Sequence, residues 1–286
     1  MIEEVGPQDI GLNGHFIKED KMDCSEKLQV LKKKLAEKEK ILISFSGGVD
    51  SSLLAKVAWD VLGENAVCVI LDSETMPRSE LENAVALARS FNISCLVAKY
   101  SIIANPDFIK NPPSRCYLCK KASARTLKTV AAEKGISCIA DGVNLSDCGD
   151  YRPGIKASDE EGIWHPFVEA GISKEDIREL AKHMGLSFWD KPSSACLASR
   201  IPYGDKITCA NLEMVEMAED YLKTLGHRQA RVRVHGNVAR IEVTEEEMEM
   251  VLLSRDRIAK ELKRAGFKYI ALDLQGFRSG SMNEVL

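Results

Sequence analysis

The sequence has no stretch of about 18 consecutive apolar residues, which a helix needs to cross a membrane. Its first residues are acidic and polar and lack the basic-then-apolar layout of a secretory signal peptide, so we expect a cytoplasmic protein. A strong excess of one charge is also missing. The formal net charge of -4 provides no global attraction to nucleic acid, and only a local basic groove could bind it. No membrane or nucleic-acid partner is therefore expected.

The sequence also lacks an even number of cysteines. Nine cysteines argue against a complete disulfide framework. Cysteines inside apolar, strand-like runs are most simply core residues, and these are Cys68, Cys95 and Cys138. The cysteines in polar, turn-rich surroundings are the candidates for chemistry, and they are Cys116, Cys119, Cys148 and Cys196.

An apolar run at residues 41–54 is interrupted by small residues and predicts a strand, a loop and a helix. Two glycines permit a tight turn, and hydroxyls add donors beside the free amides of a helix N-terminus. Such a loop binds anions, phosphates in particular. The candidate nucleotide-binding residues of this loop are Ser46, Gly47, Gly48, Asp50, Ser51 and Ser52.

This loop lacks the lysine of the pattern Gly-x-x-x-x-Gly-Lys-Ser/Thr, which disfavours kinases and GTPases. Residues 46–51, Ser-Gly-Gly-Val-Asp-Ser, resemble instead the SGGxDS signature of the PP-loop ATP pyrophosphatases. The resemblance implies ATP and Mg²⁺ as cofactors, cleavage between the α and β phosphates, and adenylation of a substrate. In that family the strand end corresponding to residues 72–77 borders the adenine. Ser73 and Met76 are therefore candidate adenine neighbours, and a plain turn is the alternative.

Helix and strand patterns alternate from residue 25 to residue 140 and predict a doubly wound parallel α/β sheet. The carboxyl ends of such strands face the ligand crevice, so Asp141 is a candidate ligand for Mg²⁺ or a ribose, unless it belongs to an Asx-rich turn. We expect an irregular segment from residue 150 to residue 164 and a structural His165. Lys174, in the first turn of a helix capped by Ser173, either reaches a phosphate or is solvated.

Two long irregular segments contain the remaining cysteine candidates. The first, residues 101–115, leads to Cys116 and Cys119 at the head of a lysine-rich helix predicted over 120–134. A helix N-terminus and nearby cations would lower the pKa of these thiols. The second, residues 189–204, contains Cys196 and Arg200 and is typical of an active-site loop at a domain junction.

The length of the chain and the change in its helix and strand pattern after residue 204 predict two domains. An N-terminal tail at 1–24 is followed by a PP-loop domain at 25–204 and a smaller C-terminal α+β domain at 205–286. The second has the predicted order α-β-β-α-β, with a long final helix from Glu245. Arg231 and Arg233 share one face of its first strand. They would be solvated unless Arg278, in a glycine and serine turn, completes an anion pocket with them.

Several motifs in addition to the glycine loop point to one family within this superfamily. They are residues 115–120 (RCYLCK), 150–154 (DYRPG), 195–204 (ACLASRIPYG) and 280–283 (GSMN). With them, residues 25–283 resemble the LarE family of ATP-dependent sulfur transferases. Those enzymes serve nickel-pincer nucleotide cofactor biosynthesis. They adenylate a carboxylate of pyridinium-3,5-biscarboxylic acid mononucleotide and convert it to a thiocarboxylate.

The resemblance implies a small-molecule mononucleotide substrate with its phosphate on Arg231, Arg233 and Arg278, a sulfide or other sulfur donor, and a homo-oligomer. It also implies that Cys196 and Arg200 are catalytic. In one branch of the family, the cysteine that matches Cys196 gives up its sulfur and becomes dehydroalanine. In another, a 4Fe-4S cluster carries the sulfur on cysteines that match Cys116, Cys119 and Cys196.

Other interpretations of the same residues stay open. A structural zinc would need a fourth ligand, for which Cys148 is the nearby candidate. Thiolation of tRNA by a PP-loop enzyme is the rival activity. The negative net charge and the lack of a recognisable RNA-binding module count against it. A non-catalytic adenine-nucleotide sensor is the other rival, although a sensor needs no thiol.

Overall fold

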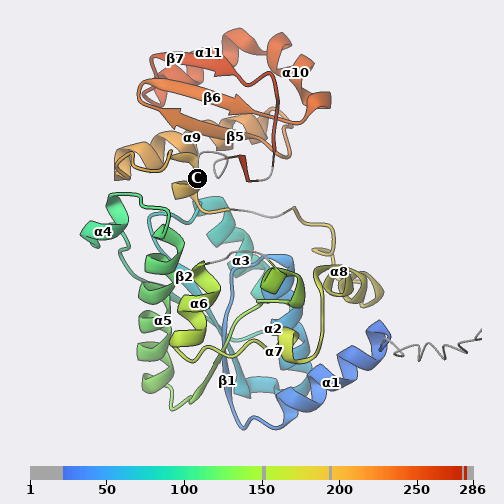
Figure 1. Ribbon diagram of the computed structural model, residues 1–286. Helices are drawn as coiled ribbons and strands as arrows, with labels where there is room; N and C mark the ends of the chain where they lie inside the picture. The colour runs from blue at the N-terminus through green and yellow to red at the C-terminus, as the bar shows by residue number, and fades with distance from the viewer. Residues whose placement is uncertain (1–21, 150–152, 193–194, 279, 282–286) are drawn as a thin grey trace, which may run out of the picture.

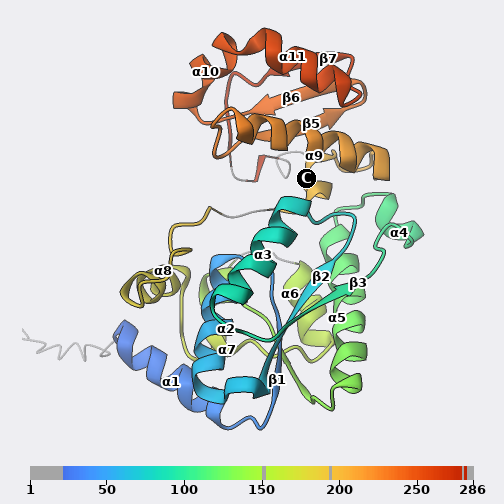
Figure 2. The ribbon, with the colours of Figure 1, turned by 180° about the vertical axis from the view of Figure 1, so that it is seen from behind.

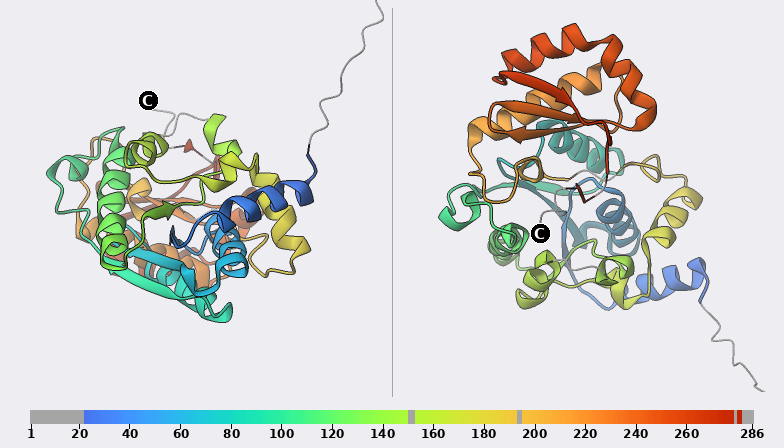
Figure 3. Two further views of the ribbon diagram at one scale, coloured as in Figure 1. Left: turned by 90° about the horizontal axis from the view of Figure 1, so that it is seen from below. Right: turned by 45° about the horizontal axis from the view of Figure 1, so that its top comes forward.

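The computed structural model describes residues 22–149, 153–192, 195–278 and 280–281. Residues 1–21 of the tail predicted at 1–24 lie outside these ranges. Asp150, Tyr151 and Arg152 of the DYRPG motif also lie outside them. Figure 1 shows the C-terminal domain stacked over the edge of a parallel sheet at which its strands end. The right view of Figure 3 shows the same layering, with the C-terminal domain in orange and red.

In the part of the chain that the structure describes, four parallel strands form one sheet in the order β3-β2-β1-β4. The prediction of a doubly wound α/β sheet is therefore confirmed. The strand order reverses between β1 and β4, and open α/β sheets bind ligands at such a switch point. The strands are β1 (Ile41–Ser44), β2 (Ala66–Asp72), β3 (Cys95–Lys99) and β4 (Cys138–Ala140).

Helices cover both faces of this sheet, which explains why its central strands β1 and β2 are apolar up to their last residues, Ser44 and Asp72. Ile43 and Cys68 belong to a core shared with α1, α2, α3 and α8, whereas Leu42 and Val69 pack with α5. No described helix is long and apolar enough to span a membrane. The helices of this domain are α1 (Cys24–Ala36), α2 (Val49–Leu62), α3 (Arg78–Ser90), α4 (Pro106–Ile109), α5 (Arg115–Glu133), α6 (Pro153–Glu160), α7 (Pro166–Glu169) and α8 (Lys174–His183).

Two helices differ from the sequence-based prediction. The segment after β4 is not irregular, because α6 runs through it and starts at Pro153, where the missing N–H of proline costs nothing. Helix α5 starts at Arg115 instead of residue 120, so Cys116 and Cys119 lie inside the helix, on its first two turns. The CxxC motif is therefore held rigidly and does not sit in a loop.

The C-terminal domain contains the short sheet β5-β6-β7, in which β5 and β6 are antiparallel and β6 and β7 are parallel. Gly236, with a φ of 57°, allows the tight β5-β6 turn. The long helix predicted from Glu245 is instead broken at Ser254. The elements are η3 (Leu197–Arg200), α9 (Cys209–Thr224), β5 (Arg231–His235), β6 (Val238–Glu242), η4 (Glu245–Glu247), α10 (Met248–Leu253), α11 (Arg255–Arg264) and β7 (Tyr269–Leu272).

The core of this domain includes residues that precede position 205. Ile102, Phe108 and Ile201 pack in one cluster with α9, β5 and β6. The boundary at 204/205 stays a prediction. Seen from behind in Figure 2, α3 and α9 meet between the domains, where Glu216 accepts a hydrogen bond from the backbone N–H of Arg78.

Candidate functional site

The glycine loop between β1 and α2 is closely packed. Gly47 has a φ of 69°, and a Cβ there would lie 2.8 Å from the Cβ of Ala84 on α3. Gly48 is the N-cap of α2 and provides no side-chain cap, so the first amides of this 14-residue helix face the site uncapped. This geometry confirms the predicted strand, loop and helix and is that of an anion site.

Gly48 is less constrained by the protein than Gly47. It has a φ of -77°, and an added Cβ would meet only the Oγ of Ser46, at 3.4 Å. The sequence predicts that Gly48→Ala abolishes adenylation. Any such effect would have to come from the approach of a phosphate, because the fold itself has room for the methyl group.

The serines of the loop have different surroundings. The Ser51 hydroxyl lies 3.1 Å from the Ser46 hydroxyl and accepts the backbone N–H of Ser46 at 3.1 Å, which closes the loop. Ser52 faces the protein interior and lines no described cavity. Ser46 and Ser51 are therefore the hydroxyls that shape the anion site.

Asp50 and Lys174 form an ion pair across the site, with the Lys174 ammonium 2.6 Å from both carboxylate oxygens of Asp50. The helix containing Lys174 is capped by Ser173, as predicted, and Asp176 completes a capping box with it. Lys174 thus lies beside the glycine loop, where an incoming phosphate would compete with Asp50 for it.

A cavity of about 290 Å³, here called the nucleotide cavity, opens over the glycine loop. One of its lining residues is Lys191, for which the sequence predicted no role. Its ammonium donates to the carbonyl of Gly47 at 3.1 Å and pairs with Glu80 at 2.8 Å. The other lining residues are Ser46, Gly48, Val49, Asp50, Thr75, Met76, Pro77, Glu80, Lys174, Pro192, Ala195 and Cys196.

The two predicted adenine neighbours lie in different places. Met76 lines the nucleotide cavity, whereas Ser73 is buried with its hydroxyl 3.1 Å from that of Thr75 and lines a separate surface cavity next to α9. The geometry thus favours Met76 as an adenine neighbour.

Asp141 lies at the end of β4, as predicted, and is already hydrogen bonded. It contacts the Nδ1 of His165 at 2.7 Å, the backbone N–H of Val143 at 3.1 Å and the Lys120 ammonium at 3.3 Å. Burial raises its pKa, but the hydrogen bond from His165 and the charge of Lys120 outweigh burial and lower the pKa to about 2. Asp141 is therefore an ionised group that organises the carboxyl end of β4.

A second cavity of about 820 Å³, here called the large cavity, lies between the two domains. It brings together residues that are far apart in the sequence: the two thiols of α5, Asp141, and cations from both domains. The cations that line it are Arg115, Lys120, Arg231, Arg233 and Arg278. Ala195 lines this cavity as well as the nucleotide cavity, so the two cavities adjoin at this residue, which precedes Cys196.

The arginine trio predicted to bind a phosphate is thus assembled in one cavity. Val232 and Val234 face the core, which leaves Arg231 and Arg233 on the opposite face of β5. Arg233 is buried and contacts Glu242 at 2.7 Å, and Arg231 lies over the Phe277 ring at 5.4 Å. Burial lowers the pKa of Arg231, because charge is less stable there, which favours binding of an anion.

The three predicted metal-binding cysteines lie near one another. Cys116 and Cys119 line the large cavity, and Cys196 is close enough to raise the pKa of both. Burial is the larger cause, and it raises the pKa of Cys119 to about 11. The expectation of lowered pKa values is therefore wrong for Cys119. For Cys116, whose side chain is exposed, desolvation by the surrounding protein outweighs the nearby Arg115 and raises the pKa as well. Among the described residues, no three His, Cys, Asp or Glu side chains are arranged to hold a metal ion.

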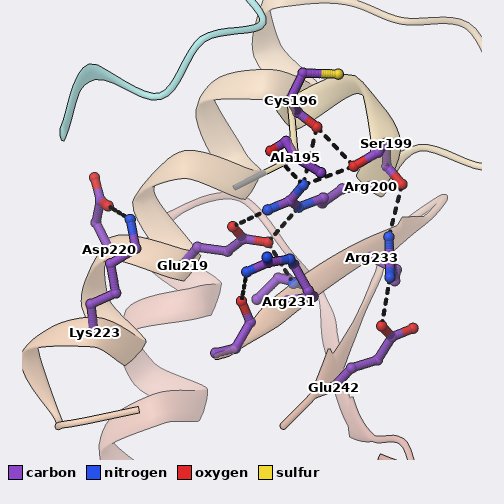
Figure 4. Close-up of polar contacts among 12 residues, drawn as sticks. Ala195, Cys196, Ser199, Arg200, Glu219, Asp220, Lys223, Arg231, Arg233 and Glu242 are labelled. Carbon is purple, nitrogen blue, oxygen red and sulfur yellow. Dashed lines mark hydrogen bonds and ion pairs between the residues drawn. The ribbon is translucent and has the colours of Figure 1, made fainter. Parts of the chain in front are cut away.

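Arg200 does not reach either cavity. Its side chain is buried, and its guanidinium contacts Glu219 and the backbone around Cys196 (Figure 4). Lys120, Lys191 and Glu219 were missed by the sequence analysis. Only Lys120 had a signal, as the last residue of the RCYLCK motif.

Comparisons with known proteins agree with this site. The profile of the NAD synthase family matches residues 24–106. An uncharacterized protein of Synechocystis sp. is 43% identical over 262 residues, 91% of this chain and 98% of the relative. Pyridinium-3,5-bisthiocarboxylic acid mononucleotide synthase of Lactiplantibacillus plantarum is 38% identical over 253 residues, 88% of this chain and 92% of the relative. An uncharacterized protein of Methanocaldococcus jannaschii is 32% identical over 257 residues, 89% of this chain and 98% of the relative.

Proposed function

The chain belongs to the family of the pyridinium-3,5-bisthiocarboxylic acid mononucleotide synthases, the LarE family, and from this membership we propose that it is an ATP-dependent sulfurtransferase. It adenylates a ring carboxylate of pyridinium-3,5-biscarboxylic acid mononucleotide and converts that carboxylate to a thiocarboxylate. The observation that carries the proposal is the junction of two cavities at Ala195, one over the glycine loop and one lined by arginines and thiols.

The first half-reaction belongs to the nucleotide cavity. A carboxylate oxygen attacks the α-phosphorus of ATP, and pyrophosphate leaves with the bonding electrons. Lys174, Lys191 and the amides at the start of α2 are placed to stabilise the leaving phosphates. Mg²⁺ is expected to be required, because clustered phosphate charge needs a counter-ion.

The second half-reaction belongs to the junction at Cys196. A sulfur nucleophile attacks the acyl carbon of the adenylate, and AMP leaves. If Cys196 is the donor, its thiolate forms a thioester, and loss of the Cα proton then breaks the Cβ–S bond. The products are the thiocarboxylate and a dehydroalanine. Because burial raises the thiol pKa values of Cys116 and Cys119, the neighbours of Cys196 are predominantly neutral at neutral pH.

The alternative sulfur carrier is a 4Fe-4S cluster on Cys116, Cys119 and Cys196. The three thiols are neighbours, but the described geometry does not form a metal site, and we derive no step through a cluster. Iron and sulfide analysis after anaerobic reconstitution would decide between the carriers. A cytoplasmic location, expected from the sequence pattern, and a homo-oligomeric state, expected from the resemblance, also stay part of this proposal.

The test of the activity is the identity of the nucleotide product. With ATP, Mg²⁺ and the mononucleotide, we expect AMP and pyrophosphate in equal amounts, and neither when the mononucleotide is left out. Chromatography of the nucleotides together with a pyrophosphate assay measures both. Release of ADP would contradict the proposal. Formation of AMP at the same rate with and without the mononucleotide would also contradict it.

Replacing Arg278 with alanine should weaken mononucleotide binding by about 1.5 to 3 kcal/mol, because a charge-assisted hydrogen bond to phosphate is lost. ATP affinity should stay nearly unchanged, since Arg278 lines only the large cavity. Titration calorimetry with each ligand measures both affinities. Arg264→Ala, which removes an arginine on the exposed face of α11, is the matched control and should bind both ligands normally. Normal mononucleotide binding by Arg278→Ala would refute this role.

A further inference from the structure

Arg200 lies beneath the cysteine loop, residues 195–200, with all three guanidinium nitrogens hydrogen bonded. Its Nη1 donates to the carbonyls of Ala195 at 2.9 Å and Cys196 at 3.1 Å, and to the Ser199 hydroxyl at 2.8 Å. The side chain is 2% exposed. A guanidinium so enclosed is not available to a substrate, so its role has to be exerted through the residues that it holds.

The counter-ion of Arg200 is Glu219 on α9. Its two carboxylate oxygens accept from the Nε and Nη2 of Arg200, each at 2.8 Å, in a bidentate pair. One of them also accepts the backbone N–H of Val232 on β5, at 3.0 Å. Glu219 therefore ties the arginine to both the helix and the sheet of the C-terminal domain. It is 4% exposed and lines neither the nucleotide cavity nor the large cavity.

The hydrogen bonds of Arg200 fix the backbone of Cys196 without covering its thiol. In Figure 4 the sulfur points away from the guanidinium, and Cys196 itself is exposed. The amide after it, that of Leu197, donates to the carbonyl of Thr75 at 2.9 Å, on the loop that leads to α3. The cysteine loop is thus fixed to the C-terminal domain on one side and contacts the rim of the nucleotide cavity on the other.

A second anchor joins the same turn to the predicted phosphate site. Arg233 donates to the carbonyl of Ser199 at 2.8 Å while it pairs with Glu242. The backbone around Cys196 is therefore held by two buried arginines, each neutralised by a glutamate of the C-terminal domain. Only one of these arginines lines a cavity.

From this arrangement we infer that Glu219 is a positioning residue: acting through Arg200, it holds Cys196 where the sulfur can meet the adenylated carboxylate. The catalytic part of the inference rests on the proposed function. The structural part, that Glu219 keeps the cysteine loop in a fixed conformation, is independent of the proposed function. A misplacement of the reacting atoms by about 1 Å can slow a reaction on the order of 100-fold.

The test compares Glu219→Gln with Asp220→Asn, which makes the same change at the next position of α9, in an exposed pair with Lys223. In Glu219→Gln we expect pyrophosphate release within about 2-fold of the wild type, and thiocarboxylate formation lower on the order of 100-fold. Asp220→Asn should change neither. Equal losses in both half-reactions, or no loss in either, would overturn the inference.

A second readout does not depend on the substrate. Hydrogen exchange measured by mass spectrometry should be faster over residues 197–201 in Glu219→Gln, and unchanged in α5. Unchanged exchange at 197–201 would overturn the structural part. If instead the wild type forms no pyrophosphate with the mononucleotide, the proposed function fails while this measurement still stands.

Glu219→Gln leaves the Arg200 charge buried without its partner and can prevent folding, so Arg200→Lys is the second variant. Lysine keeps the ion pair with Glu219, but its single ammonium cannot also bridge the carbonyls of Ala195 and Cys196. We expect the same separation of the half-reactions and the same faster exchange. Wild-type thiocarboxylate formation by a folded Arg200→Lys would refute the positioning role.

Discussion

Replacing Gly47 with alanine is expected to abolish ATP binding and pyrophosphate release. The alanine would have to adopt a φ of 69°, and its methyl group would lie 2.8 Å from the Cβ and 2.9 Å from the Cα of Ala84. Real side-chain atoms do not approach a backbone that closely, so the loop or α3 has to move. Helix α3 is held at its start by Glu216, which accepts a hydrogen bond from the backbone N–H of Arg78.

Movement of the loop would also displace the carbonyl of Gly47, which accepts from Lys191. Calorimetry should detect no ATP binding where the wild type binds. Gly135→Ala is the matched control, because Gly135 has a similar φ of 63° but nothing within 4 Å of an added Cβ. In this variant the strained backbone should lower the free energy of unfolding by only about 1 kcal/mol, and ATP binding should be kept. Tight ATP binding by Gly47→Ala would contradict the steric account.

The glycine loop could be predicted from the sequence because its signals are local. The apolar run of β1, the small residues and the start of α2 follow one another in the chain, and each fixes its own backbone geometry. The same holds for the β5-β6 hairpin, where Val232 and Val234 alternate with the arginines. Alternation alone places Arg231 and Arg233 on one face.

The start of α5 and the existence of α6 could not be predicted in the same way. The segment from residue 150 to residue 164 contains Pro153 and Gly154, which usually end helices. Gly154 packs so closely on α5 that an added Cβ would lie 3.2 Å from the Cγ of Lys120. A contact between distant segments, invisible to local propensity, thus decides the structure there.

Electrostatic roles were the least predictable part of the site. Arg200 follows Cys196 closely and looked like a catalytic cation, yet its partner Glu219 is supplied by α9, beyond the predicted domain boundary. Lys191 has no motif, and its place in the site depends on contacts with Gly47 and Glu80, which are distant from it in the sequence. The thiol pKa values likewise depend on desolvation by segments distant in the sequence, which for Cys116 outweighs the charge of Arg115.

Replacing Cys196 with alanine is expected to abolish thiocarboxylate formation while pyrophosphate is still released, about once per active site. The adenylate forms over the glycine loop, and the exposed Cys196 lines the same nucleotide cavity. The substitution removes sulfur delivery under either carrier, because the thiol is either the donor itself or one of three ligands to a cluster. Quenched-flow measurement of pyrophosphate and mass spectrometry of the mononucleotide record the two half-reactions separately.

Two other exposed cysteines provide the controls for that experiment. Cys209→Ala removes an exposed thiol at the start of α9 and should leave both half-reactions unchanged. Cys148→Ala tests the remaining zinc alternative, since it should matter only if Cys148 completes a closed metal shell. In the wild type, one turnover that leaves Cys196 lighter by H₂S identifies a sacrificed cysteine, whereas repeated turnover on added sulfide with bound iron identifies a cluster. Continued thiocarboxylate synthesis by Cys196→Ala would exclude both carriers and the role proposed for this residue.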